Sequence, residues 1–247
     1  MNKRLSTIAI LALSGNVLMA GGDIMPVEPV VVEETIDDEM KYYASMYLWA
    51  AGMSGEATNG SDFEITFKDI LESLNMTYMG NVGAQKGKWN FNADIIYMNL
   101  SQKKTFLSIK MKAWIVTPTV GYRVMESGQG TLDLQAGARY LYMKPGLTVA
   151  FLPTQYTSGN VWDGVIGFKG DYNLSEKWFM RAAADVGGGE TDLTWQAFAG
   201  VGYKYENFDV LAGYRHMQWE FDDNDAGGKV FNDLVINGPI IGATYKF

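Results

Sequence analysis

Apolar and polar residues alternate along most of this chain, as they do in β-strands whose two faces meet different environments. The alternation is clearest between residues 193 and 205. One row there consists of Trp195, Ala197, Ala199, Val201, Tyr203 and Tyr205. The other consists of Gln196, Phe198, Gly200, Gly202 and Lys204. Aromatic residues lie near both ends of the first row, which is typical of a strand face that meets lipid between two membrane interfaces.

Ten segments show this alternation between turn signals, so we expect ten strands. They cover residues 42–54, 76–86, 88–100, 110–125, 130–146, 160–173, 177–187, 193–205, 207–221 and 231–247. Short and longer connections alternate along the series, as turns and loops do in outer-membrane barrels. The sequence therefore predicts an all-β fold: a transmembrane antiparallel up-and-down β-barrel of ten strands. Eight strands is the alternative count if strands one or two are misread, and a soluble β-sandwich is the alternative outside the membrane.

Two features modify this pattern. Phe67, Ile70, Leu71 and Leu74 recur at helical spacing, so we expect a short amphipathic helix between the first two strands. That helix would either pack on the barrel rim or act as a lid or partial plug. Pro118 and the pair 238–239 fall inside expected strands, where a proline cannot donate to the ladder, and we expect a local bulge or break at both places.

The N-terminus has the organisation of a secretory signal peptide. Lys3 and Arg4 precede a short apolar run, and Ala20 offers a cleavage point. The run is too short to cross a hydrocarbon core of ~30 Å. We expect a signal peptide at 1–20, an acidic periplasmic linker rich in Pro and Val at 21–40, and the barrel at 41–247. Export would then lead to the bacterial outer membrane, with its lipid as the partner of the barrel wall.

Composition excludes several function classes. The chain of 247 residues has no cysteine, which removes disulfides and thiolate ligands, and its formal charge of -8 argues against nucleic acid as a partner. His216 is the single histidine, and Tyr214 stands where an Asp-x-His pair would carry its carboxylate. The turn at 222–228 partly matches calcium-loop spacing, but we interpret it as a solvated acidic turn. We expect no catalytic residue, cofactor or metal.

Charged residues of both signs lie on the rows expected to face inward. The acids are Asp94, Asp133, Asp163, Asp171, Asp185 and Asp209, and the bases are Arg123, Arg139, Lys169, Arg181, Lys204 and Arg215. Opposed charges at this density should pair across a narrow lumen. We predict a plugged, charge-paired lumen in a non-enzymatic barrel with a structural or surface-interaction role. The alternative is a narrow passive channel for small ions or solutes, and the sequence identifies no extracellular ligand.

Several short motifs carry a family resemblance. They are Trp162–Gly167, Asp185–Gly188, Asp192–Gln196, Gly213–Arg215 and Gly238–Gly242, with Phe67–Glu72 and Ala93–Tyr97 in the N-terminal half. Through them the chain resembles an uncharacterised family of bacterial outer-membrane β-barrel proteins, which implies the barrel fold but no assigned activity. It departs from the family pattern at Gly189–Thr191 and at His216. The terminal aromatics Tyr245 and Phe247 resemble the signature that implies recognition by the barrel assembly machinery during biogenesis.

Overall fold

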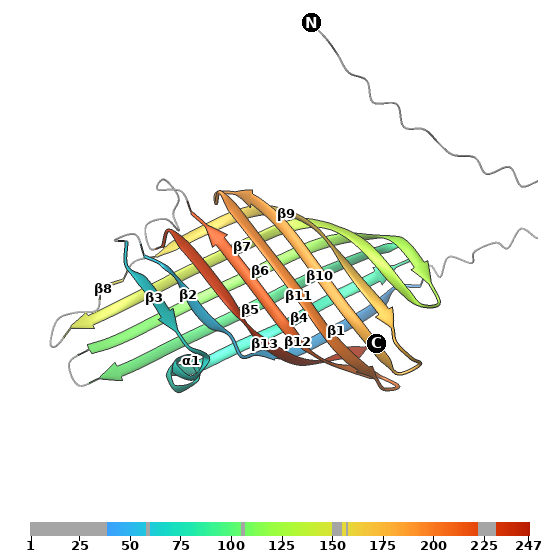
Figure 1. Ribbon diagram of the computed structural model, residues 1–247, viewed down its shortest axis with the longest axis horizontal. Coiled ribbons are helices and arrows are strands. Elements are labelled where there is room, and N and C mark those ends of the chain that lie inside the picture. The colour runs from blue at the N-terminus through green and yellow to red at the C-terminus, as the bar shows by residue number, and fades with distance from the viewer. Residues whose placement is uncertain (1–38, 58–59, 105–106, 150–154, 157, 222–230) are drawn as a thin grey trace, which may run out of the picture. The chain divides into compact units, whose positions relative to one another are not determined.

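The structure, a computed structural model, describes residues 39–57, 60–104, 107–149, 155–156, 158–221 and 231–247. Within them ten antiparallel strands close into a barrel (Figure 1). In order around the wall they are β1 (Lys41–Trp49), β4 (Leu74–Lys86), β5 (Trp89–Lys104), β6 (Leu107–Ser127), β7 (Gly130–Val149), β9 (Gly159–Asn173), β10 (Trp178–Gly189), β11 (Leu193–Lys204), β12 (Phe208–Glu220) and β13 (Asp233–Lys246). The barrel closes because β13 pairs with β1, from Tyr43 opposite Lys246 to Trp49 opposite Ile240. The predicted ten-stranded barrel is confirmed.

The first wall strand is interrupted where a proline faces it. The short strand β2 (Gly52–Glu56) continues β1 in the same register against β13. The gap between them lies opposite Gly238 and Pro239, and the Ala50 N–H donates to the Pro239 carbonyl at 2.8 Å. Pro239 has no N–H to return, so the ladder is incomplete there. The expected break at this site is confirmed.

Pro118 has a related effect on the ladder between β6 and β7. The paired residues stop at Val116 and resume at Thr119 without a change of register. The break expected at Pro118 is therefore present, whereas the bulge of β6 lies further along, between Arg123 and Met125.

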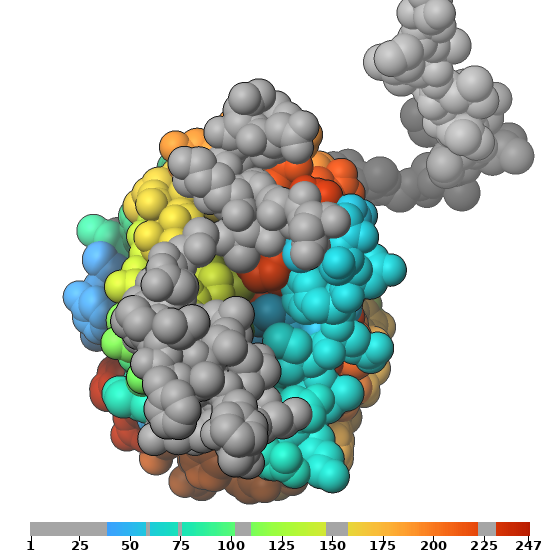
Figure 2. All heavy atoms as spheres, turned by 90° about the vertical axis from the view of Figure 1, so that its left-hand side faces the viewer, coloured from blue at the N-terminus to red at the C-terminus, as the bar shows by residue number. Residues whose placement is uncertain are grey.

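One end of the barrel carries the hairpin turns and Phe247, and we call it the turn end. At the opposite loop end, β2 pairs with β13 on one side and on the other with β3 (Asp62–Ile65), a strand the sequence did not predict. Helix α1 (Phe67–Ser73) follows, and the predicted helix is confirmed. It begins with a reciprocal cap, in which Asp69 N–H donates to Thr66 Oγ1 at 3.3 Å and Thr66 N–H donates to Asp69 Oδ2 at 3.1 Å. In Figure 2 this part of the chain appears in cyan at the loop end.

The two faces of the wall differ as the alternation predicted. Large apolar side chains are exposed on the outward rows, among them Trp89, Phe91, Trp114, Val120, Tyr122, Leu134, Ile166, Val201 and Ile241. The inward rows are mainly polar in the half near the turn end, and Asp163 and Thr194 are buried polar residues closer to the loop end. The tiny strand β8 (Gln155–Tyr156) adds to the edge of β7 at the loop end. Among the described residues, no helix has the length and apolar character needed to cross a membrane.

The inward rows near the loop end form a hydrophobic core, so the prediction of a polar interior is wrong for this half. Trp219, Met217, Leu234 and Ile96 have no exposed surface, and α1 adds Ile70. Further members are Trp49, Ala51, Met53, Met79, Met98, Leu100, Met111, Ala113, Ile115, Leu141, Met143, Val161, Phe221 and Ile236. In stretches such as 95–98 both rows are apolar, so alternation does not mark the inward face, and in others, such as 110–113 and 217–220, the polar residues lie on the outward row. We call this set the apolar core.

The helix also differs from its prediction in detail. Ile70 is buried as expected, but Leu71 is 55% exposed and Ser73 is buried in its place. The proposed signal peptide at 1–20, the linker as far as residue 38 and the acidic turn at 222–228 lie outside the described residues.

Candidate functional site: the charged lumen

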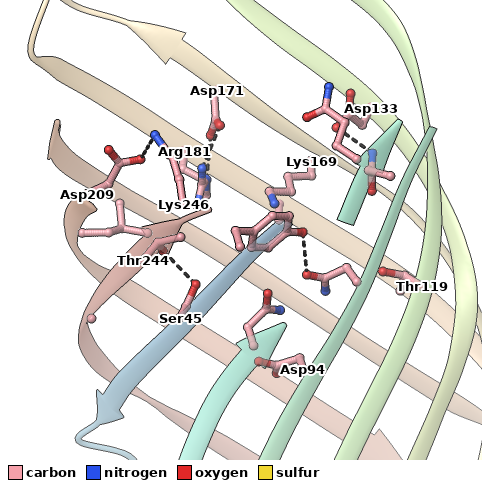
Figure 3. Close-up of a pocket in the computed structure, with 18 of the residues that line it drawn as sticks. Ser45, Asp94, Thr119, Asp133, Lys169, Asp171, Arg181, Asp209, Thr244 and Lys246 are labelled. Atoms are coloured by element: carbon pink, nitrogen blue, oxygen red, sulfur yellow. Dashed lines mark hydrogen bonds and ion pairs between the residues drawn. The ribbon is translucent and has the colours of Figure 1, made fainter. Parts of the chain in front are cut away.

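The half of the lumen near the turn end contains a cavity of about 650 Å³, which we call the cup (Figure 3). Its lining includes Lys41 at the start of β1 and Lys246 at the end of β13, so the cup reaches the turn end of the barrel. Tyr43 extends into it, and its hydroxyl donates to Asn92 Oδ1 at 3.0 Å. Gly83 allows this position, because a Cβ there would collide with the Tyr43 ring.

Where the cup meets the apolar core, hydrogen-bonded side chains link six strands around the bore. We call this set the transverse network, and it comprises Tyr47, Asp94, Arg139, Asp185, Gln196 and Arg215. Arg139 donates from Nη2 to Asp185 Oδ1 at 2.6 Å and from Nη1 to Thr194 Oγ1 at 2.9 Å. The Gln196 amide donates to the other oxygen of Asp185, which joins β10 to β11.

Arg215 continues the transverse network across the bore. Its Nη2 donates to Asp94 Oδ2 at 2.8 Å and to Gln196 Oε1 at 2.8 Å. The Tyr47 hydroxyl donates to Asp94 Oδ1 at 2.7 Å, which brings in β1. Two guanidinium groups face aromatic rings of the apolar core: Arg215 lies 5.2 Å from the ring centroid of Trp49, and Arg139 lies 5.9 Å from that of Trp219.

Three further ion pairs line the cup below the transverse network. Arg181 binds Asp171 with two parallel hydrogen bonds of 2.7 and 2.8 Å, the bidentate geometry that guanidinium favours. Arg123 Nε donates to Asp133 Oδ1 at 3.0 Å. Lys246 Nζ lies 2.6 Å from Asp209 Oδ2. These pairs fix side chains of β6, β7, β9, β10, β12 and β13 against one another.

The structure places all twelve predicted lumen residues on inward rows, and it brings eight of them together as four ion pairs. Those eight form the pairs Arg123–Asp133, Arg139–Asp185, Arg181–Asp171 and Arg215–Asp94. Asp209 pairs instead with Lys246, which was not in the predicted set. Asp163 accepts the Thr191 N–H at 2.9 Å, and Lys204 donates to Asn173 Oδ1 at 2.6 Å. Lys169 Nζ lies 5.8 Å from the Tyr43 ring.

Sequence reasoning missed the aromatic residues that border the charges. Trp49 and Trp219 are 2% and 0% exposed, and neither was predicted to face the bore. Their inward position follows from counting by twos from Arg215 and Tyr47, and that count was the available signal. Lys246 could have been found in the same way, because it shares its row with Thr244.

The outward residues singled out by the sequence lie where alternation placed them. His216 stacks on Trp195 with ring centroids 4.5 Å apart, on the outward row. Tyr245 and Phe247 are 49% and 73% exposed at the turn end. The described residues contain no group of three or more His, Asp or Glu that could hold a metal ion.

Comparison with known proteins adds little to this geometry. No family model matches the chain, and no curated protein matches it. The translocator domain of the autotransporter NalP from Neisseria meningitidis is 14% identical over 84% of this chain and 88% of that one, with a TM-score of 0.44. The outer membrane protease OmpT from Escherichia coli is 10% identical over 85% and 97%, with a TM-score of 0.48.

A third solved structure is the attachment invasion locus protein Ail of Yersinia pestis, 11% identical over 84% of this chain and 98% of that one, with a TM-score of 0.39. Identities and TM-scores at this level carry no functional argument. The fold assignment rests on the strand pairing of this chain itself.

Proposed function

We propose that this protein is an integral outer-membrane β-barrel whose lumen is closed by the apolar core and the transverse network, with a structural or surface-interaction role and no enzymatic activity. The apolar core is the observation that carries the proposal. It draws side chains from most of the wall strands into the bore, including fully buried Trp219, Ile96 and Leu234. A water path through it would have to displace close-packed apolar side chains.

Aromatic pairs on the outward rows support the membrane location. Near the turn end they are Trp89–Tyr122 and Trp178–Tyr203, and near the loop end they are Tyr97–Trp114 and Tyr140–Trp162. Trp89 and Tyr97 are eight residues apart in β5. At ~3.4 Å per residue and a strand tilt of ~40°, the two levels are about 20 Å apart along the membrane normal, close to the ~25 Å apolar band of outer-membrane barrels.

The transverse network supports closure from the polar side. Arg139 is fully buried, and Arg215 spans from β12 to Asp94 on β5. Charges held in this way are costly to separate because each would be left desolvated without its partner. They therefore fix the position of the inner wall beneath the apolar core and do not form a loose ring of side chains around an open pore.

Conductance of the refolded full chain in planar bilayers tests the proposal. A closed lumen predicts no stable unitary current. As a matched pair, Arg215→Gln removes a charge from the bore and Lys177→Gln removes one beside the turn-end residue Trp178. Stable currents whose charge preference shifts with Arg215→Gln but not with Lys177→Gln would contradict closure and establish a channel.

The second candidate function is a narrow passive channel for small ions or solutes. The cup favours it, because a charged cavity of about 650 Å³ already occupies half of the lumen. Conduction would require the apolar core to rearrange.

The absence of enzymatic activity rests on the residues present: the single histidine points outward against Trp195, away from every lumen carboxylate. Hydrolytic or acyltransfer activity of the wild type that disappears in His216→Ala would overturn the proposal that the protein is not an enzyme.

A further inference from the structure

The aspartates and the lysines that line the cup differ in their ion pairing. Each lumen aspartate that lines it is bound to a basic side chain. The pairs are Asp94–Arg215, Asp133–Arg123, Asp171–Arg181, Asp185–Arg139 and Asp209–Lys246. Two ammonium groups of the lining, those of Lys169 and Lys204, have no ion pair within the part of the chain that the structure describes.

Lys169 has a carboxylate directly opposite it but does not bind it. Asp133 is its cross-strand partner between β7 and β9. That carboxylate instead accepts from Arg123 Nε at 3.0 Å and from Asn90 Nδ2 at 2.9 Å. The Lys169 ammonium reaches into the cavity beside the Tyr43 ring, in the same wall as Asp171 and Arg181 (Figure 3).

Lys204 is in a similar position nearer the turn end. Asp209 is its cross-strand partner between β11 and β12, but Asp209 Oδ2 is bound by Lys246 at 2.6 Å. Lys204 Nζ donates to Asn173 Oδ1 at 2.6 Å and lies 5.5 Å from the Phe179 ring. Asp209 Oδ1 has no hydrogen-bond partner among the described residues, so an anion would compete with this oxygen for the lysine.

The two lysines occupy different levels of one wall. Lys169 on β9 faces Ala183 of β10, and Lys204 lies near the turn end of β11, where its ammonium approaches Phe179 of β10. Arg181 lies at a level between them. Cations arranged in this way suit an elongated ligand with at least two negative groups better than a single ion. The volume of the cup is within the ~300–1,000 Å³ usual for small-molecule sites.

We propose that the cup binds a small multivalent anion bearing phosphate or carboxylate groups, held by Lys169 and Lys204 and entering from the turn end. Hydrogen bonds between ammonium and anionic oxygens are strong where water is partly excluded. This site goes beyond the proposed barrel function, because it requires only the cup and is independent of whether the lumen conducts.

Isothermal titration calorimetry on the full chain, refolded in zwitterionic detergent, tests the site with two probes at constant ionic strength. Inorganic pyrophosphate represents the phosphate class and citrate the carboxylate class. We expect saturable binding of at least one of them. Lys169→Met and Lys204→Met should each weaken it about tenfold or more, since each removes a charge-assisted contact. Lys169→Arg should retain binding, and Lys177→Met, which leaves the cup lining unchanged, should bind as the wild type does.

The outcomes separate the ligand classes from failure of the site. Binding of pyrophosphate alone assigns phosphate, binding of citrate alone assigns carboxylate, and binding of both assigns multivalent anions in general. No saturable heat with either probe up to about 10 mM, or equal binding by the Lys169→Met/Lys204→Met variant, overturns the proposal. If Lys169→Met fails to fold, protection of Lys169 from reductive methylation by the bound probe decides, because absence of protection would equally overturn it.

Discussion

Removing Arg215 alone should destabilise the barrel more than removing Arg215 together with the charge of its partner Asp94. Their side chains are 8% and 14% exposed, with Nη2 and Oδ2 2.8 Å apart. Arg215→Met leaves the Asp94 carboxylate with the Tyr47 hydroxyl as its hydrogen-bond donor, at 2.7 Å. Breaking a buried pair from one side typically costs about 3–5 kcal/mol. We expect about 3 kcal/mol, near the lower limit, because Asp94 lines the cup and can regain some solvation there.

The assay is urea-dependent unfolding of the full chain in phospholipid vesicles, followed by tryptophan fluorescence. Asp94→Asn/Arg215→Met should cost less than Arg215→Met, and the double-mutant cycle should give a coupling of about 1.5 kcal/mol or more. Lys68→Met on α1 is the control, because the Lys68 side chain is 82% exposed and its pair with Glu72 should contribute less than about 0.5 kcal/mol. Additive costs in the cycle, or a cost of Arg215→Met below about 1 kcal/mol, would refute the view that this pair is a coupled element of the lumen.

Three further predictions concern the wall, the C-terminus and the helix. Ala199→Arg places a cation on the outward row of β11 and should cost about 2–4 kcal/mol in the same unfolding assay, while Gln135→Arg in the cup should cost less; equal costs would contradict the assignment of faces. Deletion of Phe247 should reduce the yield of heat-modifiable, membrane-inserted barrel in cells, and an unchanged yield would remove its role as an assembly signal. Thr66→Ala removes the cap of α1 and should lower the free energy of opening that helix by about 1 kcal/mol. Amide hydrogen exchange in the helix should therefore be faster, while strand amides keep their rates.

The barrel could be predicted from the sequence because the alternation of polar and apolar residues within each strand indicates two different environments. In β5, Asn90, Asn92 and Asp94 alternate with Trp89, Phe91 and Ala93, so a single strand suffices to assign both faces. The connections then set the strand order, because antiparallel neighbours joined by short turns must lie side by side. Strand β3 escaped prediction because its four residues are too few to establish a period.

The apolar core could not be recognised in this way. Along Ile95, Ile96, Tyr97 and Met98 both rows are apolar, so alternation indicates a strand but does not reveal which row fills the bore. The inward row is identified only by extending the count from a polar residue such as Asp94. The charges of the lumen can likewise be identified from the sequence, but their partners cannot. Lys169 lies directly opposite Asp133, whereas the carboxylate of Asp133 is bound by Arg123 on another strand.

A membrane barrel makes one claim that can be tested along a single strand: one row faces hydrocarbon while its neighbour faces the bore. Because the chain has no cysteine, single cysteines can be introduced and spin-labelled at 196, 197, 198, 199 and 201 in β11, with the protein refolded in phospholipid vesicles. We predict that collision with oxygen, which concentrates in hydrocarbon, is high at 197, 199 and 201 and low at 196 and 198. Loss of this alternation of two residues, or free access of a water-soluble nickel reagent to 197, 199 and 201, would contradict the claim.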